Sequence, residues 1–218
     1  MELPPVQRGV QAGNNSRLTV GIDLDGVLGD QIAGVLPRIK SRLGIDLTYE
    51  QITEFRLRLG SSDLADEIQL AQRDEAYLRD MPPHRGAAEI VAELRRHYAV
   101  LLITARPGAA RRATERWLHL HGFEFDGVVN AEESKKSVYG ADVLIDDYTG
   151  NIADFVEHTT GLGLLLDRPW NRRDRDLLHP WISGGRAVIA PSLDAVPSLI
   201  AQHRGKIVHA SANLAAPR

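Results

Sequence analysis

The amino-acid sequence predicts an α/β fold: a doubly wound, Rossmann-like parallel sheet with helices on both faces and a small helical cap inserted after the first strand. Two observations lead to this prediction. Short apolar runs alternate along the chain with helical patterns, which is the order that produces βαβ units with right-handed crossovers. The exception is 24–98, where about 75 residues without a strong strand signal exceed what one crossover needs.

The apolar runs are short and bounded by turn residues, as expected of buried strands in a parallel sheet. Six runs are predicted strands: 18–23, Ala99–Thr104, Gly127–Asn130, Val143–Asp146, Leu162–Leu166 and Ala187–Ile189. Five helical patterns accompany them: Gln31–Arg42, Ala87–His97, Pro107–His121, Asn151–Glu157 and Leu193–His203. Pro107 suits a first helical turn and Ser192 suits an N-cap.

The long stretch after the first strand is predicted to be the cap. Its helical patterns fall around 31–42, 48–58 and 63–79, and Met81-Pro82-Pro83 then interrupts the chain. An insert at this place would project over the end of the first strand; the alternative is a set of extra helices packed on one flank. The predicted parts are a flexible arm at 1–17, a core at 18–29 and 81–203, the cap at 30–80 and a flexible tail at 204–218.

Composition argues against several classes of function. Charged residues make up 25% of the 218 residues, and the formal net charge of −3 gives no bulk attraction to nucleic acid or to an anionic membrane. With 0 cysteines, a disulfide framework or a thiolate site is impossible. No apolar run reaches the roughly 18 residues of a membrane helix, and the first residues lack the apolar region of a secretory signal. We therefore expect a cytoplasmic protein, and the sequence leaves its oligomeric state open.

The first predicted strand leads directly into two aspartates. The sequence after Ile22 reads Asp23-Leu24-Asp25-Gly26, and ligand sites of open α/β sheets lie at the carboxyl ends of strands. Residues i and i+2 of a regular strand point the same way. Gly26 indicates that the chain is already turning, which could give the two carboxylates different roles. Alone, the segment is also compatible with a turn that carries two solvated acids.

Polar residues also follow other predicted strands. Thr104-Ala105-Arg106 ends the second strand, and Asp146-Asp147 ends the fourth, with Lys136 shortly before it. In a parallel sheet these residues gather at the same edge as the first two aspartates. Converging carboxylates repel one another unless a cation lies between them, and Mg²⁺ takes oxygen ligands. The Thr104 hydroxyl, the backbone after it and the Lys136 ammonium suit the oxygens of a phosphate.

These groups are suited to the hydrolysis of a phosphate ester. One aspartate can attack phosphorus, which gives an aspartyl-phosphate that water then hydrolyses. A cation and a lysine reduce the repulsion between the two anions as they approach. A second aspartate can protonate the leaving oxygen and later activate the water.

The ordered motifs resemble those of the haloacid dehalogenase-like superfamily. They are Asp23-Leu24-Asp25-Gly26-Val27-Leu28, Thr104, Lys136 and Asp146-Asp147. Within the superfamily the chain looks most similar to the 5'(3')-deoxyribonucleotidases and their bacterial relatives. Further stretches carry that comparison, which covers about residues 18–203: Ile103–Pro107, Thr114–Leu118, His121-Gly122 and Ala141–Asp147.

The resemblance implies a role for each motif. Asp23 would be the nucleophile and a Mg²⁺ ligand, and Asp25 would be the general acid and base and give its backbone carbonyl to the metal. Thr104 and Lys136 would bind phosphate. Asp146 would be the third protein ligand of the metal, with Asp147 at or just behind it. The acid at Asp25 favours phosphate esters over dehalogenation, which lacks it.

Several neighbouring residues have two interpretations. Ala105 and Arg106 could bind phosphate or substrate with Thr104, or Arg106 could be exposed at the start of a helix. Lys136 is preferred over Lys135 as the site lysine because of its spacing to Asp146 in the related enzymes. Trp170 could flank the substrate entrance, although a tryptophan that packs a loop onto the core is the preferred interpretation.

The sequence thus predicts a Mg²⁺-dependent phosphomonoesterase that works through a phosphorylated Asp23. The predicted substrate is a nucleoside 5'-monophosphate, in particular a deoxyribonucleotide; the alternative is a sugar phosphate or a biosynthetic phosphate ester. A non-catalytic phosphate-ligand binding protein of the same fold would be marked by loss of Asp23, Asp25 or Lys136, and all three are present. Related animal nucleotidases stack several cap aromatics on the base, whereas this predicted cap offers Tyr49, Phe55 and Tyr77.

Overall fold

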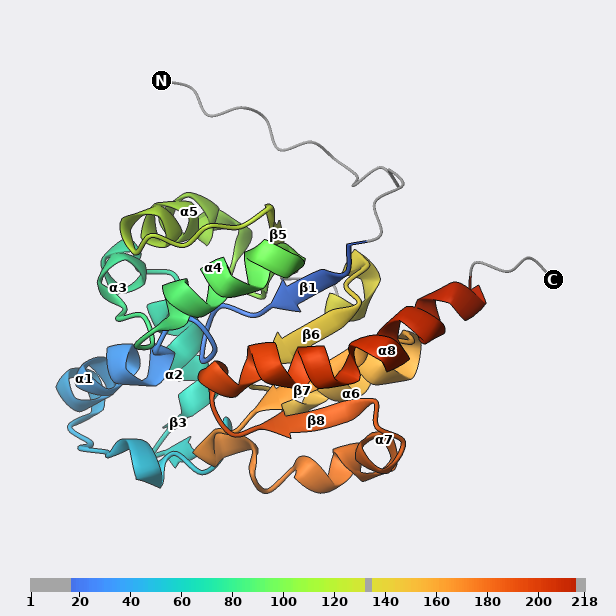
Figure 1. Cartoon of the computed structure of the whole chain (residues 1–218). Coiled ribbons are helices and arrows are strands. Elements are labelled where there is room, and N and C mark those ends of the chain that lie inside the picture. Colours follow the sequence, from blue (N-terminus) through green and yellow to red (C-terminus); the bar gives the residue numbers. More distant parts are fainter. Residues whose placement is uncertain (1–16, 132–134, 215–218) are drawn as a thin grey trace.

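A six-stranded parallel sheet forms the centre of the molecule (Figure 1). The computed structural model describes residues 17–131 and 135–214. The strands lie in the order β5-β4-β1-β6-β7-β8, and all neighbouring pairs are parallel. Their bounds are β1 Thr19–Ile22, β4 Ala99–Thr104, β5 Gly127–Asn130, β6 Val143–Asp146, β7 Leu162–Leu166 and β8 Ala187–Ala190. Each strand coincides with one of the six apolar runs, so the strand prediction is confirmed.

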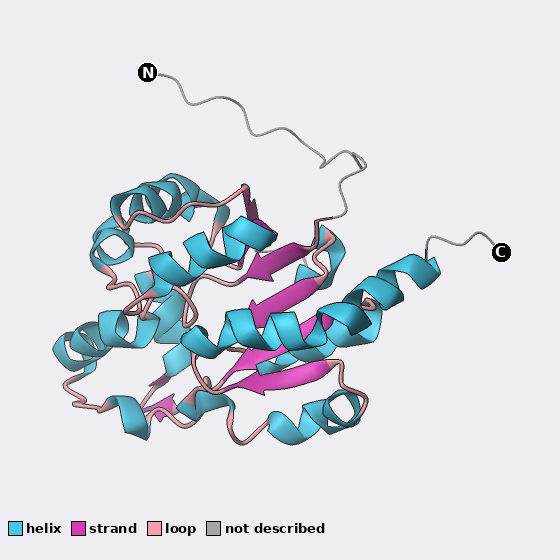
Figure 2. Ribbon diagram, viewed as in Figure 1, coloured by secondary structure: helices cyan, strands magenta, loops and turns pink. Residues whose placement is uncertain are grey.

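Helices cover both faces of this sheet (Figure 2). One face carries α4 Ala87–His97, α5 Arg111–Leu120 and α8 Val196–Leu214, and the other carries α6 Thr149–His158 and α7 His179–Ser183. Alternate strand residues serve the two faces. Ile145 packs in the cluster of α4 and α8, whereas its neighbour Leu144 packs with Phe155 of α6. The predicted doubly wound α/β fold is therefore confirmed.

Short 3₁₀ helices complete the described chain. They are η1 Tyr49–Gln51, η2 Gly108–Ala110, η3 Lys136–Tyr139, η4 Pro169–Asn171, η5 Arg175–Leu178 and η6 Leu193–Ala195. The helices predicted from Pro107 and Leu193 thus begin with a 3₁₀ turn before α5 and α8. Ser192 takes the N-cap position of η6, although its side chain makes no capping hydrogen bond.

The chain between β1 and α4 forms a layer beyond the carboxyl ends of the strands, where the arrowheads of β1 and β6 point in Figure 1. This cap contains α1 Gln31–Leu43, η1, β2 Arg58–Leu59, β3 Ser62–Asp63, α2 Leu64–Ala71 and α3 Glu75–Asp80. Its buried residues form their own hydrophobic cluster, which Ala110 of η2, Ala113 of α5 and Trp170 of η4 complete from the core. The cap therefore packs on core segments that follow the carboxyl ends of the strands.

Two helix predictions within the cap were wrong in detail. The helix predicted over 48–58 is a single 3₁₀ turn followed by the hairpin of β2 and β3, in which Gly60 has a φ of +70°. The strands of that hairpin are only two residues long, too short for alternation to be visible. The pattern over 63–79 divides into α2 and α3, because the Asp74 side chain accepts from the amide of Ala76 and starts a new helix.

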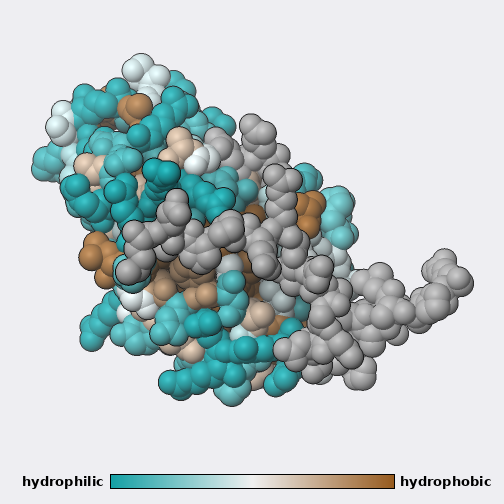
Figure 3. All heavy atoms as spheres, turned by 90° about the horizontal axis from the view of Figure 1, so that it is seen from above, coloured by the Kyte–Doolittle hydropathy of each residue, from teal (hydrophilic) through white to brown (hydrophobic). Residues whose placement is uncertain are grey.

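At the carboxyl end, α8 continues past the predicted boundary at His203 as far as Leu214. Residues 204–214 of the predicted tail are therefore helical, while the remainder of that tail and the predicted arm at 1–16 lie outside the described residues. None of the helices in the described part is both long and apolar enough to span a membrane. The face in Figure 3 is mostly hydrophilic outside the grey atoms.

Candidate active site

Three carboxylates converge at the carboxyl ends of the central strands. Asp23 follows β1, Asp146 ends β6, and Asp147 comes next in the chain. One carboxylate oxygen from each residue lies within 4.8 Å of the others. The adjacent pairing of β1 and β6, extended by a 2.9 Å hydrogen bond from the Asp23 amide to the Ile145 carbonyl, brings them together. All three residues are buried.

The ammonium of Lys136 lies between two of these carboxylates. Its Nζ is 2.7 Å from Asp23 Oδ1 and 2.7 Å from Asp146 Oδ2. Asp146 also accepts from the backbone amide of Tyr148 at 2.8 Å and from Asn151 Nδ2 at 3.0 Å. Asp146 is thus fixed by three donors, whereas Lys136 uses two of its three N–H groups on these carboxylates.

One lysine does not neutralise three buried carboxylates. Burial, with further contributions from Asp146 and Asp25, raises the pKa of Asp23 to about 7 despite the opposing effect of Lys136. Burial and the charges of Asp146 and Asp23 also raise the pKa of Asp147 well above its ordinary value. Burial alone would lower the pKa of Lys136, but Asp146 and Asp23 outweigh it and raise that pKa. The excess negative charge and the all-oxygen donor set fit a hard divalent cation.

Asp147 is held by the loop after β7. Its Oδ2 accepts a 2.9 Å hydrogen bond from Trp170 Nε1, and its backbone carbonyl accepts one of 2.8 Å from Asn171 Nδ2. Gly26 passes so close that a Cβ there would lie 2.0 Å from Asp147 Oδ2, and its φ of +83° also favours glycine. Trp170 is 1% exposed, so it packs the loop onto the core, as preferred, and also fixes a site carboxylate.

The side chain of Asp25 takes a different direction from the other three carboxylates. Its Oδ1 accepts from Arg106 Nη2 at 2.6 Å, and its Oδ2 accepts from Arg106 Nε at 2.8 Å. Oδ2 also accepts from Gln72 Nε2 in the cap at 3.2 Å. The two aspartates of the first motif therefore have separate environments, which the turn at Gly26 had made possible.

Arg106 is buried rather than exposed at a helix start. Its side chain is 0% exposed, and Nη1 donates to Thr114 Oγ1 of α5 at 3.0 Å. The guanidinium carbon lies 5.9 Å from the centre of the Trp117 ring. The guanidinium is thus committed to Asp25 and α5, so the structure does not place it at an open phosphate position.

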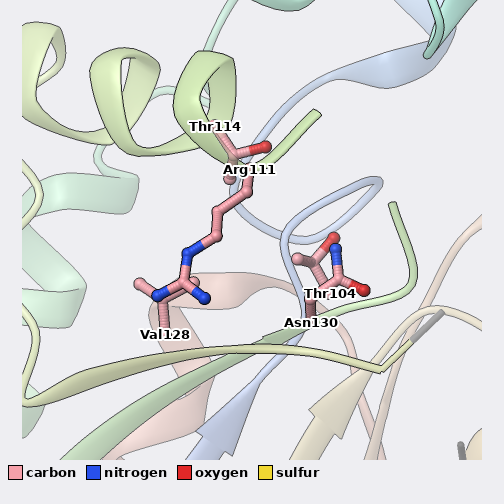
Figure 4. A pocket seen from close by; sticks show the side chains of 5 residues that line it. All are labelled: Thr104, Arg111, Thr114, Val128 and Asn130. Carbon is pink, nitrogen blue, oxygen red and sulfur yellow. The ribbon is translucent and has the colours of Figure 1, made fainter. Parts of the chain in front are cut away.

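Thr104 ends β4 with a nearly fully buried side chain, and Ala105 after it is exposed. Thr104 Oγ1 accepts from the Arg106 amide at 3.2 Å. A pocket beside Thr104 is lined also by Asn130, Val128, Arg111 and Thr114. Figure 4 shows Thr104 and Asn130 side by side, with Arg111 reaching from α5 toward Val128.

The segment that carries Lys136 is anchored on α6. Asp154 of α6 accepts a 2.7 Å hydrogen bond from Ser137 Oγ, and it also pairs with Lys135. The two residues on either side of Lys136 are therefore bound to the same carboxylate. Lys135 is largely exposed and Lys136 is buried in the site, as the spacing to Asp146 predicts.

Aromatic side chains from cap and core meet beside the carboxylates. The ring centroids of Tyr49 and Trp170 are 5.5 Å apart, those of Phe55 and Trp170 are 5.8 Å apart, and those of Phe55 and Tyr148 are 5.4 Å apart. Tyr148 is 46% exposed. Sequence reasoning named Tyr49 and Phe55 but missed Tyr148 and Gln72; the position of Tyr148 directly after Asp147 was the available signal for it.

Comparison with known proteins agrees with the resemblance found in the sequence motifs. The family model described as "5' nucleotidase, deoxy (Pyrimidine), cytosolic type C protein" matches residues 17–183. A curated protein of Staphylococcus aureus strain Mu50, named "Putative 5'(3')-deoxyribonucleotidase", is 24% identical over 136 residues, covering 61% of this chain and 74% of that protein. These matches confirm the resemblance found in the sequence motifs.

Solved structures share the fold. A haloacid dehalogenase family hydrolase from Deinococcus radiodurans R1, with bound phosphate and sodium, has a TM-score of 0.58 and 17% identity, covering 88% of this chain and 98% of that one. A haloacid dehalogenase-like hydrolase from Streptococcus pneumoniae has a TM-score of 0.56 and 16% identity, covering 84% and 97%. At these sequence identities, the similarity to the two solved structures shows a shared fold alone.

Proposed function

Because the chain belongs to the cytosolic type C 5' nucleotidase family, we propose that it hydrolyses nucleoside 5'-monophosphates, preferring deoxyribonucleotides, through an aspartyl-phosphate on Asp23. Family membership makes the chain an enzyme of the phosphatase class; the substrate, the metal and the covalent intermediate belong to the proposal. A cytoplasmic location, with the cysteine-free composition as its support, is part of it.

The observation that supports this function most is the convergence of Asp23, Asp146 and Asp147, with Lys136 in contact with the first two. Among the residues that the structure describes, the Nζ of Lys136 has one N–H left after its two carboxylate contacts, and a phosphate oxygen is a suitable acceptor for it. The Thr104 hydroxyl lies at the end of the neighbouring strand β4 and is proposed to donate to another phosphate oxygen.

In the first step, a carboxylate oxygen of Asp23 attacks phosphorus. The Asp23–phosphorus bond forms, the bond from phosphorus to the leaving oxygen breaks, and Asp25 gives its proton to that oxygen. In the second step, a water oxygen bonds to phosphorus and the water gives a proton to Asp25. The bond between Asp23 and phosphorus breaks, which releases phosphate and restores the Asp23 carboxylate. Lys136 stays beside Asp23 in both steps and stabilises the negative charge that builds up.

The donor set fits Mg²⁺, which would be held by the carboxylates of Asp23 and Asp146 and by the backbone carbonyl of Asp25, with Asp147 beside it. When bound, this ion supplies charge neutralisation around Asp23 and polarises a phosphate oxygen. Because Arg106 donates two hydrogen bonds to Asp25, we propose that it holds the proton-transfer residue in position and does not bind phosphate.

The substrate is tested by comparing catalytic efficiencies on deoxyribonucleoside and ribonucleoside 5'-monophosphates and on sugar phosphates, with Mg²⁺ and with chelator. We expect the highest kcat/KM on a deoxyribonucleoside 5'-monophosphate and no turnover with chelator. A preference for sugar phosphates would overturn the proposed substrate. No phosphate release from any ester would overturn the proposed reaction and favour a binding protein.

Replacing the nucleophile tests the mechanism directly. We expect Asp23→Asn to lower kcat by roughly four orders of magnitude or more, as loss of a nucleophile does in other covalent enzymes. The control is Asp46→Asn, a change of the same chemistry at a cap side chain that is 73% exposed, and it should leave kcat unchanged. Retained turnover by folded Asp23→Asn would contradict the mechanism.

A further inference from the structure

We propose that Gln72 of the cap, together with Arg106 of the core, positions the Asp25 carboxylate so that Oδ1 is the oxygen that exchanges the proton. This inference rests on the proposed function, because it gives Asp25 the role of general acid and base. It adds a cap residue that lies outside all the sequence motifs.

The first observation is the number of donors on this carboxylate. Among the described residues, Oδ2 accepts from Arg106 Nε at 2.8 Å and from Gln72 Nε2 at 3.2 Å, while Oδ1 accepts only from Arg106 Nη2, at 2.6 Å. A carboxylate oxygen has two lone pairs directed in the carboxylate plane. Oδ2 is therefore saturated and Oδ1 has one acceptor position left.

The second observation is that the two donors come from different parts of the fold. Arg106 is fixed in the core, since its side chain is 0% exposed and bonds to Thr114. Gln72 is the C-cap of α2, and its backbone amide donates to the carbonyl of Ile68 at 2.9 Å. The position of α2 is set by the cap cluster, which includes Ile68 and Ala71. The cap thus reaches the proton-transfer residue through one side-chain amide.

The chemistry follows from the free position on Oδ1. Asp25 gives the Oδ1 proton to the leaving oxygen as the bond from that oxygen to phosphorus breaks, and becomes a carboxylate. Three N–H donors then stabilise this carboxylate, and Oδ1 takes a proton from the attacking water in the second step. Without Gln72, Oδ2 would also be free, and the carboxylate could present the wrong oxygen.

Gln72 gives a cleaner test than Arg106, whose removal would leave a buried polar cavity. Gln72 is half-buried, and Gln69 on the same helix is exposed, so Gln69→Ala is a matched control. The quantity to compare is the loss of rate that each variant shows on esters with different leaving groups. A nucleoside leaves as an alkoxide and needs protonation, whereas p-nitrophenol leaves as a stabilised phenolate and needs little.

We expect Gln72→Ala to lower the first-turnover rate of nucleoside release from thymidine 5'-monophosphate about tenfold, the scale of one hydrogen bond to a charged group. On p-nitrophenyl phosphate the same variant should lose less than about twofold, and Gln69→Ala should match the wild type on both esters. Gln72→Glu, which sets a second carboxylate against Asp25, should lose more than Gln72→Ala on the nucleotide. Asp25→Asn, which also lacks the base for the second step, should lose turnover on both esters and keep a single burst of p-nitrophenol.

Equal losses of the first-turnover rate on both esters, or a rise in KM with an unchanged first-turnover rate, would overturn the positioning role and assign Gln72 to cap folding or substrate binding. An unchanged first-turnover rate of Gln72→Ala on the nucleotide would overturn it as well. If the wild type hydrolyses neither ester, the proposed function itself fails. If it hydrolyses both and only the leaving-group dependence is missing, the inference about Gln72 fails alone.

Discussion

Single residues at the site differ in how their charge is balanced. Asp25 pairs with Arg106, whereas Asp23 and Asp146 share Lys136, and Asp147 lies beside them. The raised pKa values of Asp23 and Asp147 are the consequence, because a buried carboxylate without a full counter-charge holds its proton. A bound cation would therefore favour the ionised form of the candidate nucleophile.

This imbalance predicts a pH-dependent stability difference. The pKa of Asp23 is raised to about 7, so between pH 3.8 and 7 the folded chain holds a proton that the unfolded chain has released. Asp23 therefore contributes stability at low pH, which is lost as the pH rises through about 7. Asp23→Asn removes this contribution. In metal-free buffer the free energy of unfolding of wild type relative to Asp23→Asn should fall by roughly 2–3 kcal/mol from pH 5 to pH 8.

Urea unfolding at both pH values measures that difference. Mg²⁺ should stabilise the wild type more at pH 8 than at pH 5, because protons compete with the ion for the carboxylates. A stability difference between the two proteins that does not change with pH would show that the Asp23 carboxyl is not perturbed in the folded chain.

Among the elements, α6 lies on one face of the sheet and holds two parts of the site in position. Its first turns supply Asn151, which donates to Asp146, and Asp154, which binds both neighbours of Lys136. Burial opposes ionisation of Asp154, but hydrogen bonds from Lys135 and Ser137 outweigh it and lower the pKa of Asp154. The site lysine thus depends on a helix that carries none of the motif residues.

Asp154→Asn should loosen the segment that carries Lys136. Because the exposed Lys135 pair contributes little, the loss comes mainly from the Ser137 hydrogen bond, and we expect kcat/KM to fall by roughly fivefold. We expect KM for phosphate esters to rise, with little change in the free energy of unfolding. Glu157→Gln, an exposed change on the same helix, serves as the control. An unchanged kcat/KM for Asp154→Asn would mean that Lys136 is held without this anchor.

The elements also show where sequence reasoning reached its limit. Runs such as Leu162–Leu166 are apolar because helices cover both faces, so each strand was visible by itself. The hairpin of β2 and β3 has no such signal, and only the Gly60-Ser61 turn marks it. The helix past His203 was missed because Arg204-Gly205-Lys206 is typical of a helix end.

For the whole molecule, the parallel sheet is what turns separate motifs into a site. Asp23 and Asp146 end neighbouring strands, so their meeting could be predicted once the sheet was inferred. The pair between Asp25 and Arg106 could not be, since 81 residues separate them and nothing local shows that Arg106 turns inward. The contact from Gln72 depends on how the cap packs, which the cap sequence does not specify.

The account's central claim is that Asp23 carries the phosphoryl group, and one variant makes this state observable. Asp25→Asn lacks the base for the second step, and p-nitrophenyl phosphate needs little acid for the first. Asp25→Asn is mixed with p-nitrophenyl phosphate and Mg²⁺, and a stoichiometric burst of p-nitrophenol should appear. After quenching with acid, mass spectrometry of the peptides should show a phosphoryl group on Asp23. A phosphoryl group on another residue, or product release with an unmodified Asp23 peptide, would contradict the claim.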